Sequence, residues 1–383
     1  MELADSLDSR HPRYAETMKG KGRFDYILLI VALGLVGIGI VMVYSTSAIL
    51  AADRFQDPYH FLKRQALYAG IGFVLMILMM CFPYEILKRF AYPIFLVSIL
   101  FLIVVLIPGI GHRAGGSIRW LKIQSFSFQP SEFAKLGLII FLAYFLTKKE
   151  EKIRSFSFGF LPTILLSGIV IVLLAMEPDF GAALFLTVMV FLLLFVSGAR
   201  LIYVAGALLL AAPVVYYLLM SAAYRYKRLI SFIRPWEDPT GTSFQIIQSF
   251  LSFGSGGLFG LGLGEGRQKL FFLPAPHTDF IFSIIGEELG LAGAMIVVLL
   301  FFILTLRGIQ IGLSVGDRFG TYLALGITLM ISLQAVINMG VVLGLLPTKG
   351  LTLPLVSYGG TSLVANLVGV GVLLRLSTLT ERR

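Results

Sequence analysis

The tripeptide His-Thr-Asp at 277–279 places Asp279 directly before a long apolar run. Two prolines shortly before it end the preceding loop, so either Thr278 or Asp279 can cap the helix that follows. Position alone favours an N-cap carboxylate, which the helix dipole stabilises. The alternative is a general base beside a lipid-facing cavity, where the carboxylate removes a proton from a hydroxyl group. The spacing of these residues does not separate the two interpretations.

Other charged residues lie within apolar segments, where an ionisable group is costly and is a functional candidate by default. Glu287 and Glu288 follow Asp279 on the same predicted helix, about 80° and about 180° around it, so only one of them can face the same cavity. A buried, partnered pair of carboxylates is a nearly equal alternative. Glu132 and Lys135 share one helical face and can form a structural ion pair.

Three connecting segments carry further polar candidates. Glu177 and Asp179 flank a proline in an acidic turn that can contact a divalent cation or a substrate, or can serve only as a turn. Lys349 is the only basic residue of its loop, and the segment after it, 353–361, contains Ser357, a proline and paired glycines. That composition indicates a broken backbone, which a membrane tolerates only where it lines protein or a cavity.

The segment 224–234 has the pattern of an amphipathic helix. Its apolar side chains fall on one side, and Lys227, Arg228 and Arg234 fall on the other, which suits the surface of the outer leaflet. Ordinary contact with lipid headgroups and specific binding of a pyrophosphate are equally good interpretations. The glycine-rich stretch 254–267 lacks a preceding strand and a Gly-Lys-Ser/Thr ending, so it favours closely packed, bent backbone over a nucleotide site.

The composition places all of these residues in a membrane protein. The 383 residues are 57% hydrophobic and only 14% charged, with a mean hydropathy of +0.90, whereas soluble globular proteins are about 25% charged. These values exclude a soluble enzyme and a disordered chain. One cysteine and four histidines leave little material for a disulfide or a zinc centre. The net charge of +10 is better explained by membrane topology and anionic lipid than by nucleic acid.

A hydrocarbon core of about 30 Å requires about 20 apolar residues per helix, and this window predicts an all-α protein with about ten membrane spans. A basic tail (1–25) precedes the membrane domain (26–376), a long ordered loop (221–279) separates spans seven and eight, and a short tail (377–383) follows. The predicted spans are 26–48, 65–82, 90–108, 131–146, 160–176, 181–198, 201–220, 280–306, 322–345 and 361–376.

Lysine and arginine predict the orientation of these spans. They are enriched in the N-terminal tail, in the alternate short loops that share its side, and in the C-terminal tail. Because such loops stay in the cytoplasm, both termini are predicted to be cytoplasmic. The long loop 221–279 and the polar candidates near Asp279 then face the outside. A cavity open to the outer leaflet, with a basic rim and a carboxylate, suits an anionic, lipid-linked substrate.

Six short motifs occur in order along the chain, and they are Arg119-Trp120-Leu121, Phe-Gln-Pro-Ser-Glu-Phe-Ala-Lys at 128–135, Glu-Pro-Asp-Phe-Gly at 177–181, the stretch 254–269, His-Thr-Asp-Phe-Ile-Phe at 277–282 and Ser-Tyr-Gly-Gly at 357–360. Their combination resembles the SEDS family of shape, elongation, division and sporulation proteins, from the first span to the last. The segments 346–354 and 287–290 resemble the division members of that family more than the elongation members.

This resemblance implies a ten-helix peptidoglycan glycosyltransferase of the bacterial cytoplasmic membrane that polymerises lipid II during division. It matches Asp279 to the essential aspartate of the family, assigns Glu132 and Lys135 to the core, and makes Trp120 and Lys349 functionally sensitive positions. It also implies a single-span partner, a class B penicillin-binding protein with transpeptidase activity, among other division proteins. The family often has Glu after Leu-Pro in the loop where this chain has Ala275, so a role for that Glu is not carried over.

The resulting hypothesis is an inverting transfer with Asp279 as general base, in which basic residues, with or without Mg²⁺ or Mn²⁺, stabilise the polyprenyl pyrophosphate that leaves. A lipid II flippase that uses Glu132, Lys135 and Glu287 is one alternative, and a non-catalytic division scaffold is another. No other cofactor is expected. The residues expected to contact substrate are Arg119, Trp120, Lys122, Glu177, Asp179, Lys227, Arg228, Lys269, His277, Lys349 and Ser357.

Overall fold

The computed structural model describes residues 22–114, 117–123, 126–220, 223–241, 243–269, 276–348 and 350–380. Lys349 therefore lies outside the described residues, as do most of the N-terminal tail and the segment 270–275. Within the described part, seven helices are long and apolar enough to cross a membrane, and three shorter apolar helices accompany them. Together they confirm the predicted multi-pass helical membrane protein.

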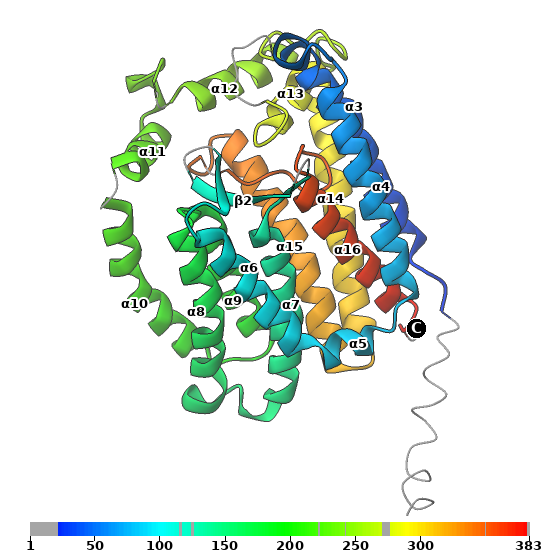
Figure 1. Cartoon of the computed structure of the whole chain (residues 1–383), viewed down its shortest axis with the longest axis vertical. Coiled ribbons are helices and arrows are strands. Elements are labelled where there is room, and N and C mark those ends of the chain that lie inside the picture. Colours follow the sequence, from blue (N-terminus) through cyan, green and yellow to red (C-terminus); the bar gives the residue numbers. More distant parts are fainter. Residues whose placement is uncertain are drawn as a thin grey trace, which may run out of the picture.

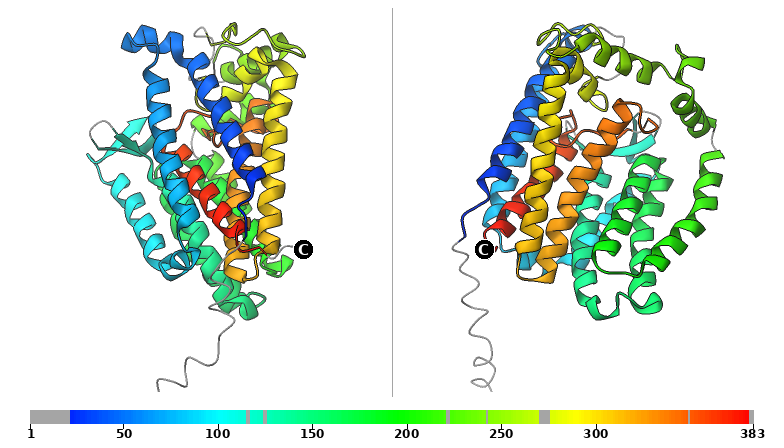
Figure 2. Two further views of the ribbon diagram at one scale, coloured as in Figure 1. Left: turned by 90° about the vertical axis from the view of Figure 1, so that its right-hand side faces the viewer. Right: turned by 180° about the vertical axis from the view of Figure 1, so that it is seen from behind.

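The ten membrane helices pack as a bundle in which most connections are short (Figures 1 and 2). The fifth continues from a π-helical turn, η2 (Phe156–Phe160), into α8, and a short helix, α5 (Tyr84–Arg89), precedes α6. The membrane helices are α3 (Tyr26–Phe55), α4 (His60–Cys81), α6 (Ala91–Leu106), α7 (Pro130–Lys148), α8 (Leu161–Met176), α9 (Phe180–Val196), α10 (Leu201–Met220), α14 (Gly290–Ser314), α15 (Arg318–Val342) and α16 (Gly360–Ser377).

The eighth span was predicted as one continuous helix over 280–306, and this prediction is wrong at its start. The structure divides it into a short helix, α13 (Ile281–Glu288), and the spanning helix α14. The break falls at Gly290, whose φ of +67° favours glycine. A Cβ atom at Gly290 would also collide with the backbone nitrogen of Gly260. The apolar pattern continues through this break because both helices bury apolar side chains.

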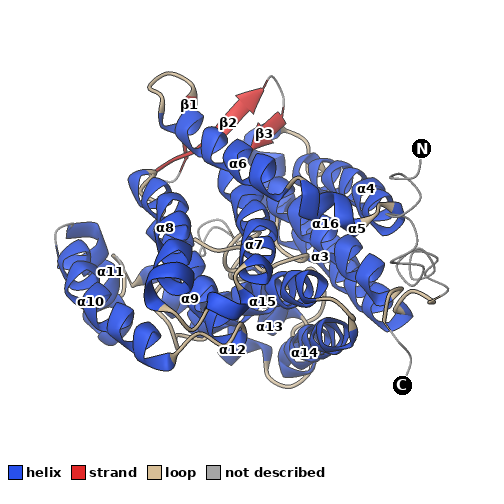
Figure 3. Ribbon diagram, turned by 90° about the horizontal axis from the view of Figure 1, so that it is seen from below, coloured by secondary structure: helices blue, strands red, loops and turns tan. Residues whose placement is uncertain are grey.

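The segment between α6 and α7 forms a small sheet that the all-α prediction did not include. Strands β1 (Gly111–Ala114), β2 (Ser117–Ile123) and β3 (Phe126–Phe128) pair antiparallel in the order β1-β2-β3. Gly111 lies opposite Leu121 in the first pair, and Leu121 lies opposite Phe128 in the second. This sheet lies at the edge of the bundle in Figure 3, beside α6.

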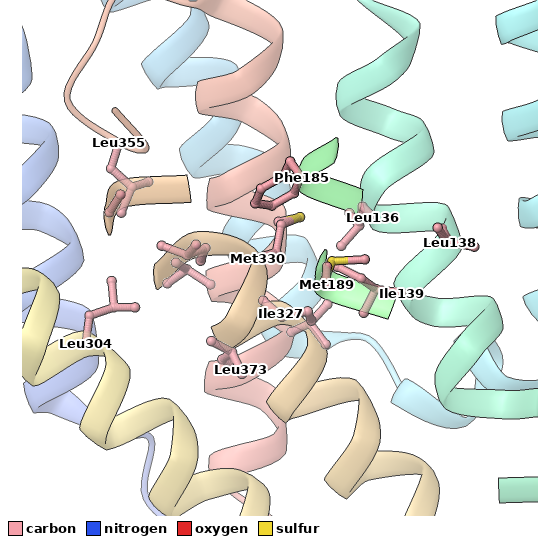
Figure 4. Packing of buried hydrophobic residues seen from close by; sticks show 14 of the residues in the cluster. Leu136, Leu138, Ile139, Phe185, Met189, Leu304, Ile327, Met330, Leu355 and Leu373 are labelled. Atoms are coloured by element: carbon pink, nitrogen blue, oxygen red, sulfur yellow. The ribbon is translucent and has the colours of Figure 1, made fainter. Parts of the chain in front are cut away.

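Helices α7 and α15 lie in the middle of the bundle (Figure 3). Most side chains of α7 are buried around its whole circumference, as expected for a helix in the centre of a bundle. Helix α15 packs against α7, α9, α14 and α16. Figure 4 shows the apolar side chains that meet there, which include Leu136, Ile139, Phe185, Met189, Ile327 and Met330.

The described ends of the chain lie at the lower end of the bundle in Figure 1. There the Asp25 backbone N–H donates to Ser377 Oγ at 3.0 Å, and Arg307 bonds Asp25 through Nε at 2.8 Å. Tyr84 bonds Asp317 at 3.1 Å at the same end. The sheet and the helices of the long loop lie at the upper end (Figures 1 and 2). This arrangement agrees with the predicted order of spans and loops.

The long loop between α10 and α14 contains ordered helices, as expected. They are α11 (Ala223–Ile233), the short 3-10 turn η3 (Pro235–Glu237), α12 (Phe244–Gly256) and α13. Helix α10 lies at the edge of the bundle beside α9, and α11 and α12 continue from it across the upper end (Figures 1 and 3). A second 3-10 turn, η1 (Glu150–Lys152), connects α7 to η2 at the lower end.

Candidate active site

Asp279 does not cap a helix. The N-cap of α13 is Phe280, and no side chain accepts a cap hydrogen bond there, so the N-cap interpretation is wrong. The Asp279 backbone is instead fixed by a tertiary contact, because Asn338 Nδ2 on α15 donates to Asp279 O at 2.8 Å. The same amide donates to Leu351 O at 2.7 Å. Asn338 thus joins the Asp279 segment to the loop before α16.

Two further hydrogen bonds hold the residues just before Asp279. Ser357 Oγ donates to Thr278 O at 2.6 Å and accepts from the Leu353 N–H at 2.9 Å. The Tyr358 N–H donates to His277 O at 2.9 Å. The broken backbone predicted around Ser357 therefore lines protein and supports Asp279. Ser357 is buried, and its hydroxyl group is engaged in both of these bonds.

The Asp279 carboxylate is half-buried and faces two arginines. Desolvation raises its pKa to about 6, and the charges of Arg119 and Arg228 oppose this rise while Asp179 adds to it. A Cβ atom placed on Gly350 would lie 3.3 Å from Asp279 Oδ2 and 3.8 Å from an Arg119 terminal nitrogen. The Asp279 carboxylate and the Arg119 guanidinium therefore both lie beside Gly350.

Arg119 also connects Asp279 to the acidic turn. Its Nε lies 3.3 Å from Asp179 Oδ2, and a terminal nitrogen donates to Pro178 O at 3.2 Å. Asp179 caps α9 by accepting from the Ala182 N–H at 3.0 Å. Glu177 is fully buried, and neither of its carboxylate oxygens has a hydrogen-bond partner among the described residues. Burial and the neighbouring Asp179 raise the Glu177 pKa to about 8, so this group is mostly protonated at neutral pH.

Strand β2 separates the three expected contacts at 119–122. Successive side chains of a strand point to opposite faces, so Arg119 and the buried Leu121 share one face. Trp120 and Lys122 lie on the other face, where Trp120 is half-buried and Lys122 is exposed. Only Arg119 of these three is directed toward Asp279.

His277 is part of an aromatic cluster. Its ring lies 4.5 Å from that of Phe61 on α4 and 5.5 Å from that of Tyr358, measured between ring centroids. Burial, with a smaller contribution from Arg54, lowers the His277 pKa to about 4, so the imidazole is neutral at physiological pH. It therefore packs α4 against the Asp279 segment and supplies no positive charge to a phosphate.

Lys269 was expected at the substrate, but the structure gives its ammonium group another partner. Lys269 Nζ lies 2.6 Å from Glu288 Oε1 and 3.1 Å from Ser45 Oγ on α3. Both charged side chains are almost fully buried. Glu287 accepts from the backbone N–H groups of Arg267 and Gln268, at 2.7 and 3.2 Å. The buried, partnered alternative is therefore confirmed for the two glutamates, and they hold the glycine-rich segment in place.

The expected ion pair on α7 is present. Lys135 Nζ lies 2.8 Å from Glu132 Oε2 and donates to Gln334 Oε1 on α15 at 2.9 Å. Gln334 in turn donates to Thr352 O at 2.9 Å. Lys135 is 1% exposed and Glu132 is 7% exposed, so the pair links the bundle core to the loop that carries Gly350.

Replacing Lys135 with methionine should destabilise the protein by about 3–5 kcal/mol, because Glu132 would remain buried without its cation. The double variant Glu132→Gln/Lys135→Met should recover most of that loss, since no charge is then left unpaired. Thermal unfolding in one detergent measures both effects. A double variant no more stable than Lys135→Met would contradict the interpretation as a structural pair.

Asn338→Ala should lower the rate of any reaction in which Asp279 is the base by about tenfold or more, because a displacement of about 1 Å takes a reacting group out of its productive geometry. The pH at which that rate falls on the acid side should stay the same, since the charged groups around Asp279 are unchanged. Steady-state kinetics across pH test this. A shifted acid limb with unchanged kcat would contradict a positioning role for Asn338.

Asn338 and Gln334 were not among the candidates predicted from the sequence. Both are amides one helical turn apart within an apolar span, and polar side chains in that setting need internal partners. This signal was available, but their partners, the backbones of 279 and 351–352, are distant in sequence.

Lys227 and Arg228 are exposed on α11, and only Arg228 acts on the Asp279 pKa.

The described residues contain no group of three or more His, Cys, Asp or Glu side chains that could hold a metal ion. Asp179 is already engaged by Arg119 and by the start of α9, and Glu177 is enclosed. The acidic turn thus offers no ligand set for the divalent cation that the sequence allowed.

Fold and site together define a polytopic helical membrane protein with a carboxylate–arginine centre at one end of its bundle. A family model for cell cycle proteins of the FtsW/RodA/SpoVE type matches residues 26–382. The chain therefore belongs to this family, which confirms the resemblance seen in its motifs.

Curated relatives cover nearly the whole chain. A probable peptidoglycan glycosyltransferase FtsW from Geobacter metallireducens is 48% identical over 356 residues, which are 93% of this chain and 95% of that protein. Stage V sporulation protein E of Bacillus subtilis is 45% identical over 353 residues, 92% of this chain and 96% of that protein.

Two solved structures have the same fold. One belongs to a study of how a peptidoglycan synthase complex coordinates polymerization and crosslinking; it has a TM-score of 0.77 and 31% identity, and the match covers 92% of this chain and 97% of that one. The rod shape determining protein RodA of Thermus thermophilus has a TM-score of 0.69 and 30% identity, over 94% of this chain and 98% of that one.

Proposed function

We propose that this protein is a peptidoglycan glycosyltransferase that polymerises lipid II into glycan strands during cell division. The observation that carries the proposal is the Asp279 carboxylate, which is half-buried, fixed through its backbone, and flanked by Arg119 and Arg228. Relatives that cover nearly the whole chain bear the name peptidoglycan glycosyltransferase FtsW. A carboxylate with a pKa near 6 has the basicity that proton abstraction from a sugar hydroxyl needs.

In the proposed reaction, the acceptor 4-hydroxyl attacks the anomeric carbon of the donor sugar and the configuration inverts. Asp279 accepts the hydroxyl proton as the new C–O bond forms. The bond between the anomeric carbon and the pyrophosphate oxygen breaks, and the polyprenyl pyrophosphate leaves with the electron pair. Because this leaving group is already a stable anion, no general acid is required.

Positive charge near the departing pyrophosphate stabilises the transition state. Arg119 and Arg228 are the cations whose charges reach Asp279. Lys227 and Lys122 are exposed and, with Lys349 and Trp120, are proposed as contacts for the more distant parts of the substrate. Lys269 has no place in this set, since Glu288 takes up its charge.

The proposed orientation places both termini in the cytoplasm and the upper end, with Asp279, outside the cytoplasmic membrane. The supporting observation is that the described ends meet at one end of the bundle while the site lies at the other. The partner proposed is a class B penicillin-binding protein that crosslinks the new strands. Its support is the similarity to a chain from a synthase complex that polymerises and crosslinks.

The raised pKa of Asp279 predicts the pH dependence of the reaction. A general base must be ionised, so kcat/KM should fall on the acid side of about pH 6, by about tenfold for each unit below it. An unperturbed aspartate would keep its charge down to about pH 4. Lipid II polymerisation measured between pH 5 and pH 8 checks this, and a flat profile down to pH 5 would contradict the assignment.

Polymerisation of purified lipid II by the reconstituted protein, with and without a class B transpeptidase, tests the function itself. Glycan strands should form and should require Asp279. Transfer of labelled lipid II between leaflets without any polymer would favour a flippase. Absence of both activities, with normal division by a variant that lacks the carboxylate, would favour a scaffold.

A further inference from the structure

A short glycine-rich segment at the upper end presents unusually exposed apolar side chains. We refer to residues 257–264 as the apolar finger. Leu258 and Phe259 are 65% and 84% exposed, and Leu261 and Leu263 are 42% and 56% exposed. No charged residue occurs between positions 254 and 264. Contiguous apolar surface of this kind marks a site of interaction.

The finger is held rigidly by backbone hydrogen bonds to the break between α13 and α14. The N–H groups of Leu261 and Gly262 donate to the carbonyl oxygens of Glu287 and Glu288, both at 3.0 Å. In return, the N–H groups of Leu291 and Ala292 donate to the carbonyls of 257 and 258, at 2.9 and 3.0 Å. The exposed side chains are therefore a fixed feature of the fold.

The backbone of the finger packs so closely against α13 that only glycine fits at one position. Gly260 has a φ of +82°, and a Cβ atom there would collide with the backbone of Glu288. The Gly264 N–H also donates to Glu288 Oε2 at 3.1 Å, and the Glu288 carboxylate in turn bonds Lys269 and Ser45. Since Ser45 lies on α3, these bonds fix the height of the finger relative to a membrane span.

That height matches the outer boundary of the hydrocarbon. Helix α3 begins at Tyr26 at the lower end, and Ser45 lies nineteen residues further along it. At 1.5 Å per residue this distance is about 29 Å, close to the hydrocarbon thickness of about 30 Å. Gln56, at the end of α3, lies about 16 Å further out along the same axis.

The finger is also continuous with a lipid-facing surface. Helix α14 begins where the finger is bonded, and its first outward side chains, Leu291, Met295 and Ile296, are 51%, 56% and 54% exposed. The exposed charged residues Glu265 and Arg267 follow the finger directly. Apolar side chains next to charged ones, at the height of the acyl-chain boundary, have the pattern of an interfacial anchor.

We propose that the apolar finger inserts into the outer leaflet beside α14 and anchors the extracytoplasmic loop at a fixed depth. Burying its side chains among acyl chains removes apolar surface from water, which is favourable. Because the finger is bonded to α13, whose first residue lies two positions after Asp279, it fixes the depth of the site in the bilayer. The proposal does not depend on the reaction at that site.

Site-directed fluorescence in liposomes tests this insertion with the full chain. The only cysteine, Cys81, is replaced by serine, and single cysteines are introduced by Phe259→Cys, Leu263→Cys, Met295→Cys and Gln56→Cys. Each is labelled with an environment-sensitive nitrobenzoxadiazole probe in phosphatidylglycerol–phosphatidylethanolamine vesicles. Quenching by nitroxide lipids measures contact with acyl chains, and quenching by iodide measures contact with water.

Probes at 259 and 263 should give the blue-shifted emission and nitroxide quenching of the Met295→Cys probe, which faces lipid. The Gln56→Cys probe should be quenched by iodide and not by nitroxide lipids. Iodide quenching at 259 and 263 equal to that at 56 would overturn the proposal. Protection that arises only when a class B transpeptidase is added would also overturn it, in favour of a protein-docking surface.

Discussion

Asp279→Asn should lower the rate of lipid II polymerisation by at least about 10²-fold, because the amide has no basic oxygen with which to accept the hydroxyl proton. The fold should be unaffected, since the backbone bonds from Asn338 and Tyr358 that hold this segment do not involve the side chain. Removing a partly desolvated carboxylate should leave thermal stability unchanged or slightly higher. Polymer formation and thermal unfolding, measured on one preparation, separate catalysis from folding.

A matched control is available at the same end of the molecule. Asp57 is a half-buried carboxylate that pairs with Lys63 at 2.8 Å, so Asp57→Asn removes the same charge without touching the site and should leave the rate unchanged. Asp279→Glu keeps the carboxylate but displaces it, and should retain more activity than Asp279→Asn. Full polymerisation by the Asp279→Asn protein would place the base elsewhere.

The membrane spans were predictable because side chains that contact lipid must be apolar, which hydropathy measures directly. Helices such as α14 and α9 carry long apolar runs, and all ten predicted spans correspond to helices in the structure. The break between α13 and α14 was not predictable in this way. It depends on Gly290 meeting the backbone of Gly260, a contact between residues thirty positions apart. Local sequence does not encode such a contact.

The candidate site could be predicted from the sequence only in part. Asp279 was a candidate because it stands directly before an apolar run, but the spacing left a general base and an N-cap open, and the resemblance to the SEDS family singled it out. The partner of Lys269 could not be read from the sequence, because Glu288 reaches it through a tertiary fold of the glycine-rich segment. Likewise, Arg119 could not be distinguished from Trp120 and Lys122 until the strand between them was known. Strand alternation directs only Arg119 of these three side chains toward Asp279.

Arg119 is the second residue expected to have a large effect. Arg119→Ala should lower kcat/KM by about 10²–10³-fold, the usual cost of losing a preorganised charge at the site of developing negative charge. It should also change the pH profile. The guanidinium lowers the Asp279 pKa, so its removal should raise that pKa and move the acid limb to higher pH.

Asp179→Asn should change the Asp279 pKa in the opposite direction. The Asp179 charge raises the Asp279 pKa, and asparagine can still cap α9, so the acid limb should move to lower pH with the helix intact. Lys63→Ala, which removes an exposed cation at the same end, should change neither rate nor profile. Opposite displacements of one acid limb by Arg119→Ala and Asp179→Asn would require all three charges to act on one base. If Arg119→Ala lowers the rate but leaves the limb in place, Arg119 acts only through structure or substrate binding, and the electrostatic link to Asp279 is wrong.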